Sequence, residues 1–128
     1  MNPRARTQEL RRKLQLADTQ GLVLEGDLDA LGALRGDLEA LDGDATASLF
    51  VTLNESSLVA LAGPIVASAA ADHLTWVSYP KAGKLGTDLN RDLLAALVIA
   101  RGVRPVRQIA LDATWSALRF RPQLAGGG

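Results

Sequence analysis

The chain contains no cysteine, a single histidine and few aromatic residues, and each scarcity excludes a class of function. Without cysteine there can be no disulfide, no thiolate metal site and no thiol catalysis, which fits a reducing compartment. The lone His73 precedes a predicted strand and has no second histidine to share a metal, so we expect neither a metal site nor a catalytic histidine. With aromatic residues at 4% of the chain, the core must be built mainly from Leu, Ala, Val and Ile.

Long hydrophobic runs are also missing. No apolar stretch is long enough to cross a membrane, and residues 1–6 lack the apolar segment of a secretory signal. A length of 128 residues suits one domain with one substantial core. We therefore expect a cytoplasmic protein with a single domain over residues 1–123 and a flexible tail at residues 124–128.

The formal net charge is zero, yet the charges are segregated along the chain. Residues 1–17 carry five basic side chains and one acidic one, residues 18–72 carry one and ten, and residues 73–128 carry eight and three. The last segment could attract an anion or an acidic partner, whereas the acidic middle opposes nucleic-acid binding. The simpler interpretation is that the acidic and basic parts balance each other within one small domain.

The hydrophobic pattern predicts strands that alternate with helices. Helices are expected at residues 7–16, 28–41, 55 onward with an interruption at Gly63-Pro64, and 88–101; strands are expected at residues 21–26, 48–53, 74–79, 106–111 and 115–121. This order indicates an α/β three-layer sandwich around a mostly parallel sheet of about five strands. The short link at residues 112–114 allows only a hairpin, so an antiparallel C-terminal edge strand is expected. Arg119 and Arg121 would protect that edge from aggregation.

Residues 79–92 join a strand to a helix through a small-residue loop, which is where open α/β sheets hold their ligands. Lys81 and Lys84 flank Gly83 just before the predicted helix start, where free N–H groups and the helix dipole favour an anion. A small-anion site is therefore predicted here, formed by Tyr79, Lys81, Lys84, Thr87, Asp88 and Arg91. The alternative is a solvated loop in which Asp88 simply caps the helix.

Two residues of the closing hairpin have both a functional and a structural interpretation. Asp112 could accept a hydrogen bond from a ligand or act as a base near the loop after Tyr79, with Trp115 beside it. Equally, Asp112 could cap a tight turn while Trp115 fills the core, and this structural interpretation is the simpler one. No serine lies in a nucleophile-elbow motif.

Three motifs together resemble a bacterial family of small domains of unknown function. They are Trp76-Val77-Ser78-Tyr79-Pro80-Lys81, Thr87-Asp88-Leu89-Asn90-Arg91-Asp92, and Asp112 with Trp115-Ser116-Ala117-Leu118-Arg119-Phe120. The resemblance implies a reduced Rossmann-like domain, similar to the methyltransferase fold, and implies no known activity. The sequence departs from active relatives of that fold because the turn after the first strand, residues 25–32, lacks G-x-G-x-x-G and is acidic. The usual cofactor site is therefore interpreted as missing or eroded, and no cofactor is expected.

These observations lead to three hypotheses of different classes. The first is a non-enzymatic or ligand-sensing domain with a small-anion site at residues 79–92, contacted by Lys81, Lys84 and Arg91. The second is a module for protein–protein interaction or self-association, which would leave a homo-oligomer open. A small methyltransferase is the third and least favoured, because its Gly-rich turn is absent.

Overall fold

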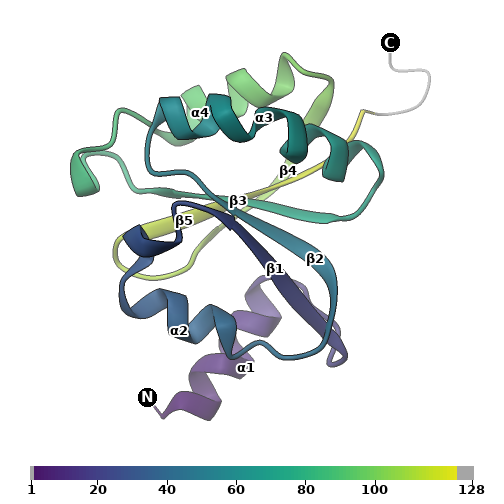
Figure 1. Ribbon diagram of the computed structural model, residues 1–128, viewed down its shortest axis with the longest axis vertical. Coiled ribbons are helices and arrows are strands. Elements are labelled where there is room, and N and C mark those ends of the chain that lie inside the picture. Colours follow the sequence, from purple (N-terminus) through teal and green to yellow (C-terminus); the bar gives the residue numbers. More distant parts are fainter. Residues whose placement is uncertain (1, 124–128) are drawn as a thin grey trace.

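The computed structural model describes residues 2–123, which form an α/β domain around one five-stranded sheet (Figure 1). The predicted tail at residues 124–128 lies outside the described residues. The elements in chain order are α1 (Pro3–Lys13), β1 (Gln20–Gly26), η1 (Leu28–Leu31), α2 (Ala33–Glu39), β2 (Asp44–Val51), α3 (Glu55–Ala70), β3 (Leu74–Pro80), η2 (Lys84–Gly86), α4 (Arg91–Ile99), β4 (Val103–Ala110) and β5 (Trp115–Pro122). Here η denotes a short 3₁₀ helix.

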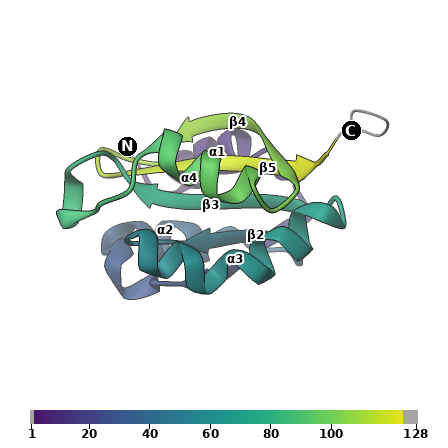
Figure 2. The ribbon, with the colours of Figure 1, turned by 90° about the horizontal axis from the view of Figure 1, so that it is seen from above.

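Helices cover both faces of the sheet, so the predicted α/β sandwich is confirmed (Figures 1 and 2). On one face α1 and α2 bury their leucines against Leu49, Val51 and Trp76. On the other face α3 and α4 pack on Phe50 and Val77. The side chains of β2 and β3 therefore alternate between two hydrophobic cores, as expected for strands buried on both sides.

The strand order is β1-β2-β3-β5-β4, and within the described residues the sheet is mixed. The pairs β1–β2 and β2–β3 are parallel, whereas β3–β5 and β5–β4 are antiparallel. The predicted hairpin and its antiparallel final strand are confirmed. Its predicted place at the edge is wrong, because β5 folds back between β3 and β4. Protection of a sheet edge therefore cannot explain Arg119 and Arg121.

The crossovers do not all share one hand. From β1 to β2 to β3 the chain steps in the same direction across the sheet, yet α2 and α3 lie on opposite faces. The step from β3 to β4 continues in that direction with α4 on the face of α3. The β1–α2–β2 unit therefore has the opposite hand to the other two, although such crossovers are nearly always right-handed.

Two of the predicted helices differ in detail from the observed ones. The expected helix at residues 28–41 is broken at Gly32, whose φ of 59° lies in the left-handed region, into η1 and α2. The expected interruption at Gly63-Pro64 is wrong, because α3 runs through Pro64. Pro64 is exposed on α3, so its ring faces solvent and the packed side of the helix is undisturbed.

Asparagine side chains cap the starts of α1 and α3. Asn2 starts α1 by accepting the Ala5 N–H, earlier than predicted, and Asn54 starts α3 by accepting the Ser57 N–H at 2.9 Å. None of the helices in residues 2–123 has the length and apolar character needed to cross a membrane.

Candidate functional site

An open cleft of about 530 Å³ lies at the edge where β3 ends, beside the start of α4 and the β4–β5 hairpin. It is lined by Tyr79, Lys81, Ala82, Asn90, Arg91, Asp92, Gln108 and Ser116. We call it the corner cleft. Because β1, β2 and β3 are parallel, this is the carboxyl edge of the sheet, where α/β folds commonly bind ligands.

Backbone hydrogen bonds hold the loop that follows β3. The Lys81 N–H donates to the Thr114 carbonyl at 2.8 Å, which ties the loop to the turn between β4 and β5. The Lys84 N–H donates to the Lys81 carbonyl at 2.8 Å and closes a tight turn. Lys81 therefore has a fixed backbone, and its half-buried side chain lines the cleft.

The start of α4 faces the same cleft. Asn90 caps the helix by accepting the Leu93 N–H at 2.8 Å, so α4 begins at Arg91 and not near Asp88 as predicted. Within the described chain, the first-turn N–H groups of Arg91 and Asp92 have no hydrogen-bond acceptor. These two donors, together with the positive end of the helix dipole, favour a negatively charged group at this point.

Tyr79 forms the floor of the cleft. Its side chain is only 2% exposed, and its hydroxyl accepts a hydrogen bond from Gln108 Nε2 at 3.0 Å. Ser116 lies directly opposite Tyr79 on β5 and also lines the cleft. Burial raises the pKa of Tyr79 above its ordinary value, and the nearby Arg91 guanidinium only partly opposes this. The phenol therefore keeps its proton near pH 7 and can donate a hydrogen bond to a ligand.

The raised Tyr79 pKa predicts a loss of stability in alkaline solution. Titration of Tyr79 should cause no change in the free energy of unfolding with pH below 10.0, the ordinary tyrosine pKa. As pH rises from 10.0 through the pKa of the folded protein, the free energy of unfolding should fall. Because Tyr79 is the sole tyrosine in the chain, tyrosinate absorbance reports its titration directly. Tyr79→Phe should remove this part of the pH dependence, and a Tyr79 that titrates at or below its ordinary pKa would contradict the buried geometry.

The cleft carries two cationic groups and one anionic group. Lys81 and Arg91 supply the positive charges, and Asp92 supplies a carboxylate that pairs with Arg91 Nη1 at 3.2 Å. The Asp92 side chain is 92% exposed and that of Arg91 is 49% exposed, so the pair contributes little to stability. An incoming anion can therefore displace Asp92 from Arg91 at small cost.

Three of the predicted site residues, Tyr79, Lys81 and Arg91, meet in the corner cleft. Lys84, Thr87 and Asp88 do not line it. Lys84 is exposed in η2, and Thr87 Oγ1 accepts the Leu89 N–H at 3.0 Å.

Asp88 has a different task from the one predicted. Its Oδ1 accepts the Glu55 N–H at 2.8 Å, at the start of α3. The carboxylate thus satisfies a free donor of a different helix from α4, and it ties the loop after β3 to α3.

Asp112 and Trp115 also lie outside the cleft lining. Asp112 Oδ1 accepts the N–H groups of Thr114 and Trp115 at 2.8 and 2.7 Å, which closes the hairpin turn. The Trp115 side chain is 1% exposed and belongs to the core covered by α1 and α2. This geometry is that of the structural interpretation, in which Asp112 caps the turn and Trp115 fills the core.

Sequence reasoning did not single out Asn90, Asp92, Gln108 or Ser116 as contributors to the cleft. Asn90 and Asp92 belong to one of the three motifs of the resemblance. They were not assigned to the site because the helix was expected to begin at residue 88, whereas α4 begins at Arg91. Gln108 gave no signal, because it comes near Tyr79 only when β5 inserts between β3 and β4 and places Gln108 beside Leu118.

A second hollow, of about 410 Å³, lies at the same edge after β1 and β2, where a Rossmann-like fold would hold its cofactor. Asp27 Oδ2 accepts the Leu53 N–H at 2.9 Å, and Asp29 Oδ1 pairs with Arg35 Nη1 at 2.8 Å. A Cβ added at Gly26 would overlap the Val51 carbonyl oxygen. The glycine at this turn is thus needed for strand packing, and the carboxylates would repel a pyrophosphate.

Residues 2–123 contain no group of three or more histidine and acidic side chains that could hold a metal ion. No family model matches the sequence, and neither a curated protein nor a solved structure matches it. The resemblance to the family of unknown function therefore stays a prediction.

Proposed function

We propose that this chain is a small cytoplasmic, non-enzymatic domain that binds a small anion in the corner cleft. The observation that carries the proposal is the convergence there of Lys81, Arg91 and the unsatisfied N–H groups that begin α4. Tyr79, Gln108 and Ser116 add neutral donors on the floor. Such a set fits a phosphate, sulfate or carboxylate group, each of which accepts several hydrogen bonds.

The hand of the β1–α2–β2 crossover supports descent from a larger Rossmann-like domain. In a doubly wound sheet with strand order 3-2-1-4-5, the first and fourth strands are neighbours, and their helices lie on opposite faces. Removing the second and third strands would leave two neighbouring parallel strands whose following helices lie on opposite faces. β1, α2, β2 and α3 have this arrangement. The reduced Rossmann-like fold implied by the resemblance is therefore part of the proposal.

The state of the hollow after β1 argues for a non-enzymatic role over a methyltransferase. In this descent the hollow corresponds to the ancestral switch point, which is where the cofactor would bind. Here the Asp27 carboxylate accepts a hydrogen bond from the Leu53 N–H. The Val51 carbonyl oxygen lies so close to Gly26 that it fills the space beside this glycine. Failure of S-adenosylmethionine to bind is expected.

Removing the two cations tests the anion site. We expect Lys81→Gln combined with Arg91→Gln to weaken binding of phosphate or sulfate by at least about tenfold, because each charge-assisted hydrogen bond contributes about 1.5–3 kcal/mol. Isothermal titration calorimetry at fixed, low ionic strength measures this directly. Asp92→Asn should strengthen binding, since it removes the competing carboxylate from Arg91.

Lys84→Gln is the matched control for this experiment. It removes one positive charge from the same loop, but Lys84 does not line the cleft. Equal weakening by Lys84→Gln and by the Lys81/Arg91 variant would indicate a diffuse charge effect and would refute a defined site.

Self-association is the second candidate function, and the exposed edge of β1 favours it. β1 ends the sheet in the described chain and has Val23 37% exposed. Unpaired strand edges are templates for pairing with another chain. Light scattering at low and high salt tests this function, and a monomer at both salt concentrations excludes it.

A further inference from the structure

Four arginines are grouped on the neighbouring strands β4 and β5. Arg104 on β4 lies directly opposite Arg121 on β5, and Arg107 lies directly opposite Arg119. Like charges placed directly opposite each other in an antiparallel pair are destabilising. We call these four residues the arginine cluster.

An irregularity in β4 creates the cluster. Arg104 and Arg107 are three positions apart, so in a regular strand their side chains would point to opposite faces. The register shifts between Pro105 and Arg107, which leaves Val106 without a partner and brings both arginines to one face. Bulges of this kind often re-aim side chains near functional sites.

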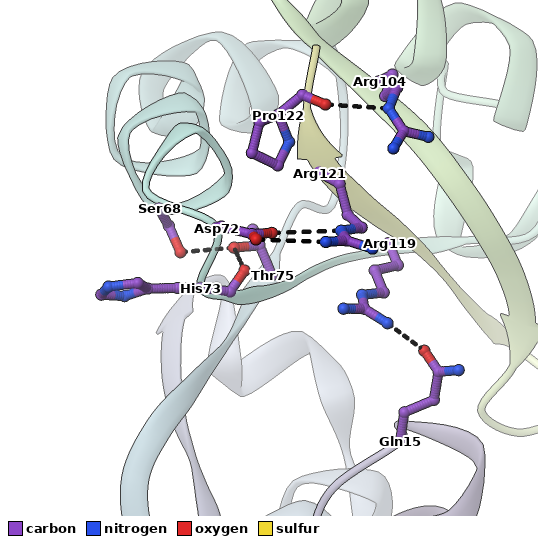
Figure 3. A network of polar contacts seen from close by, with 9 residues as sticks. All are labelled: Gln15, Ser68, Asp72, His73, Thr75, Arg104, Arg119, Arg121 and Pro122. Atoms are coloured by element: carbon purple, nitrogen blue, oxygen red, sulfur yellow. Dashed lines mark hydrogen bonds and ion pairs between the residues drawn. The ribbon is translucent and has the colours of Figure 1, made fainter. Parts of the chain in front are cut away.

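The cluster has little compensating negative charge from within the described chain. Arg121 pairs with Asp72 through two contacts of 3.3 Å (Figure 3). Among the described residues, Asp72 is the one carboxylate that pairs with the arginine cluster. Arg104 Nε donates to the Pro122 carbonyl at 3.0 Å. The exposed side chain of Arg107 has no ion-pair or hydrogen-bond partner among residues 2–123.

One nitrogen of the Arg119 guanidinium is hydrogen-bonded, and another is buried without a hydrogen-bond partner in the described structure. Its Nη1 donates to Gln15 Oε1 at 2.6 Å, as Figure 3 shows, while its Nε is buried and has no partner in the described structure. Burial lowers the pKa of Arg119, and the positive charges of Arg121 and Arg107 lower it further against the opposing effect of Asp72. An anion would relieve this repulsion.

A polar cleft of about 490 Å³ adjoins the cluster at the amino-terminal edge of the parallel strands. The residues that line it are Gln15, Gln20, Thr46, Asp72, His73, Leu74 and Arg119, so the carboxylate that pairs with Arg121 lies in the cleft itself. The amides, hydroxyl and imidazole can hydrogen-bond a polar ligand. Nearby Asp44 and Asp72 disfavour a long polyanion such as RNA, which would extend beyond the arginines.

We propose that the arginine cluster and this cleft form a second site, which binds a small molecule carrying adjacent phosphate groups. Guanidinium groups match phosphate geometry with paired N–H donors, and two cross-strand arginine pairs suit two neighbouring phosphates. The polar remainder of the ligand would occupy the cleft beside Gln15, Gln20 and Thr46. The site does not depend on the corner cleft, which lies at the opposite edge of the sheet.

Calorimetric titration with inorganic pyrophosphate tests the proposal. Arg107→Gln with Arg121→Gln should weaken binding about tenfold or more, because two charge-assisted contacts are lost. Arg107 and Arg121 are not part of either hydrophobic core, so the variant should fold. Asp72→Asn should instead strengthen binding by freeing Arg121, and asparagine tolerates the φ of 60° at this position.

Two control variants distinguish a defined site from a general effect of positive charge. Arg101→Gln removes an exposed charge that follows α4 and should leave pyrophosphate affinity unchanged, as should the Lys81/Arg91 variant of the corner cleft. Pyrophosphate affinity that is absent in the unaltered protein, or that falls equally with Arg101→Gln, would overturn the proposal. Tighter binding of a single-stranded RNA oligonucleotide than of pyrophosphate, with the same arginines required, would overturn the assignment to a small ligand.

Discussion

Replacing Trp115 by alanine is expected to lower the free energy of unfolding by about 3–5 kcal/mol, the typical cost of removing a large aromatic side chain from a core. Trp115 is 1% exposed and packs in the core under α1 and α2. Such a loss is a large part of the total stability of a domain of this size. Guanidinium unfolding followed by circular dichroism measures the change, since it does not depend on tryptophan fluorescence.

The same position decides between the structural and the ligand-binding interpretation of Trp115. Trp115→Phe retains much of the packing and should fold, with phosphate affinity in the corner cleft unchanged. A Trp115→Phe variant that is as stable as the parent protein but has lost anion binding would show that the indole contacts the ligand. In that case the described geometry, in which Trp115 lies outside the cleft lining, would be wrong.

Gly26→Ala is expected to destabilise the fold by about 2–5 kcal/mol. Gly26 has a φ of 112°, which an L side chain adopts only with strain, and the added Cβ would overlap the Val51 carbonyl oxygen. The estimate adds the cost of a left-handed backbone, about 1–2 kcal/mol, to that of overpacking, about 1–3 kcal/mol. Thermal unfolding of the two proteins measures the difference.

Gly36→Ala is the matched control for Gly26→Ala. Gly36 lies within α2, and a Cβ there meets nothing within 4 Å. This substitution should stabilise the protein by roughly 0.5–1 kcal/mol, because alanine favours the helix. If Gly26→Ala is tolerated as well as Gly36→Ala, the turn after β1 has room for a side chain, and the hollow there is not closed to a cofactor in the way we propose.

The periodicity of the sequence predicted the number of strands and their alternation with helices. It succeeded because β3, residues 74–80, is rich in apolar residues and contributes side chains to both cores, and because the leucines at residues 31–41 repeat at helical spacing. It could not place β5. A short hairpin link fixes that β4 and β5 pair, but it does not determine on which side of β4 the returning strand lies.

The position of β5 in the sheet could not be predicted, and this limited the prediction of both sites. Gln108 approaches Tyr79, and the four arginines share one face, only after β5 has inserted beside β3 and the bulge at Val106 has formed. By contrast, Lys81 and Arg91 could be predicted from local sequence, because strand ends and helix starts carry their own signals. The role of Asp88 could not be predicted from local sequence, because its carboxylate accepts a hydrogen bond from the Glu55 N–H at the start of α3, which is distant in sequence.

The central claim is an anion site in the corner cleft, and the Tyr79 titration in the presence of phosphate tests it most directly. Tyr79 is the sole tyrosine, so the absorbance change reports the floor of that cleft and no other place. A bound anion disfavours tyrosinate, so saturating phosphate should raise the Tyr79 pKa further in the parent protein and not in the Lys81→Gln/Arg91→Gln variant. A Tyr79 pKa that is the same with and without phosphate, sulfate and carboxylates at matched ionic strength would contradict the claim.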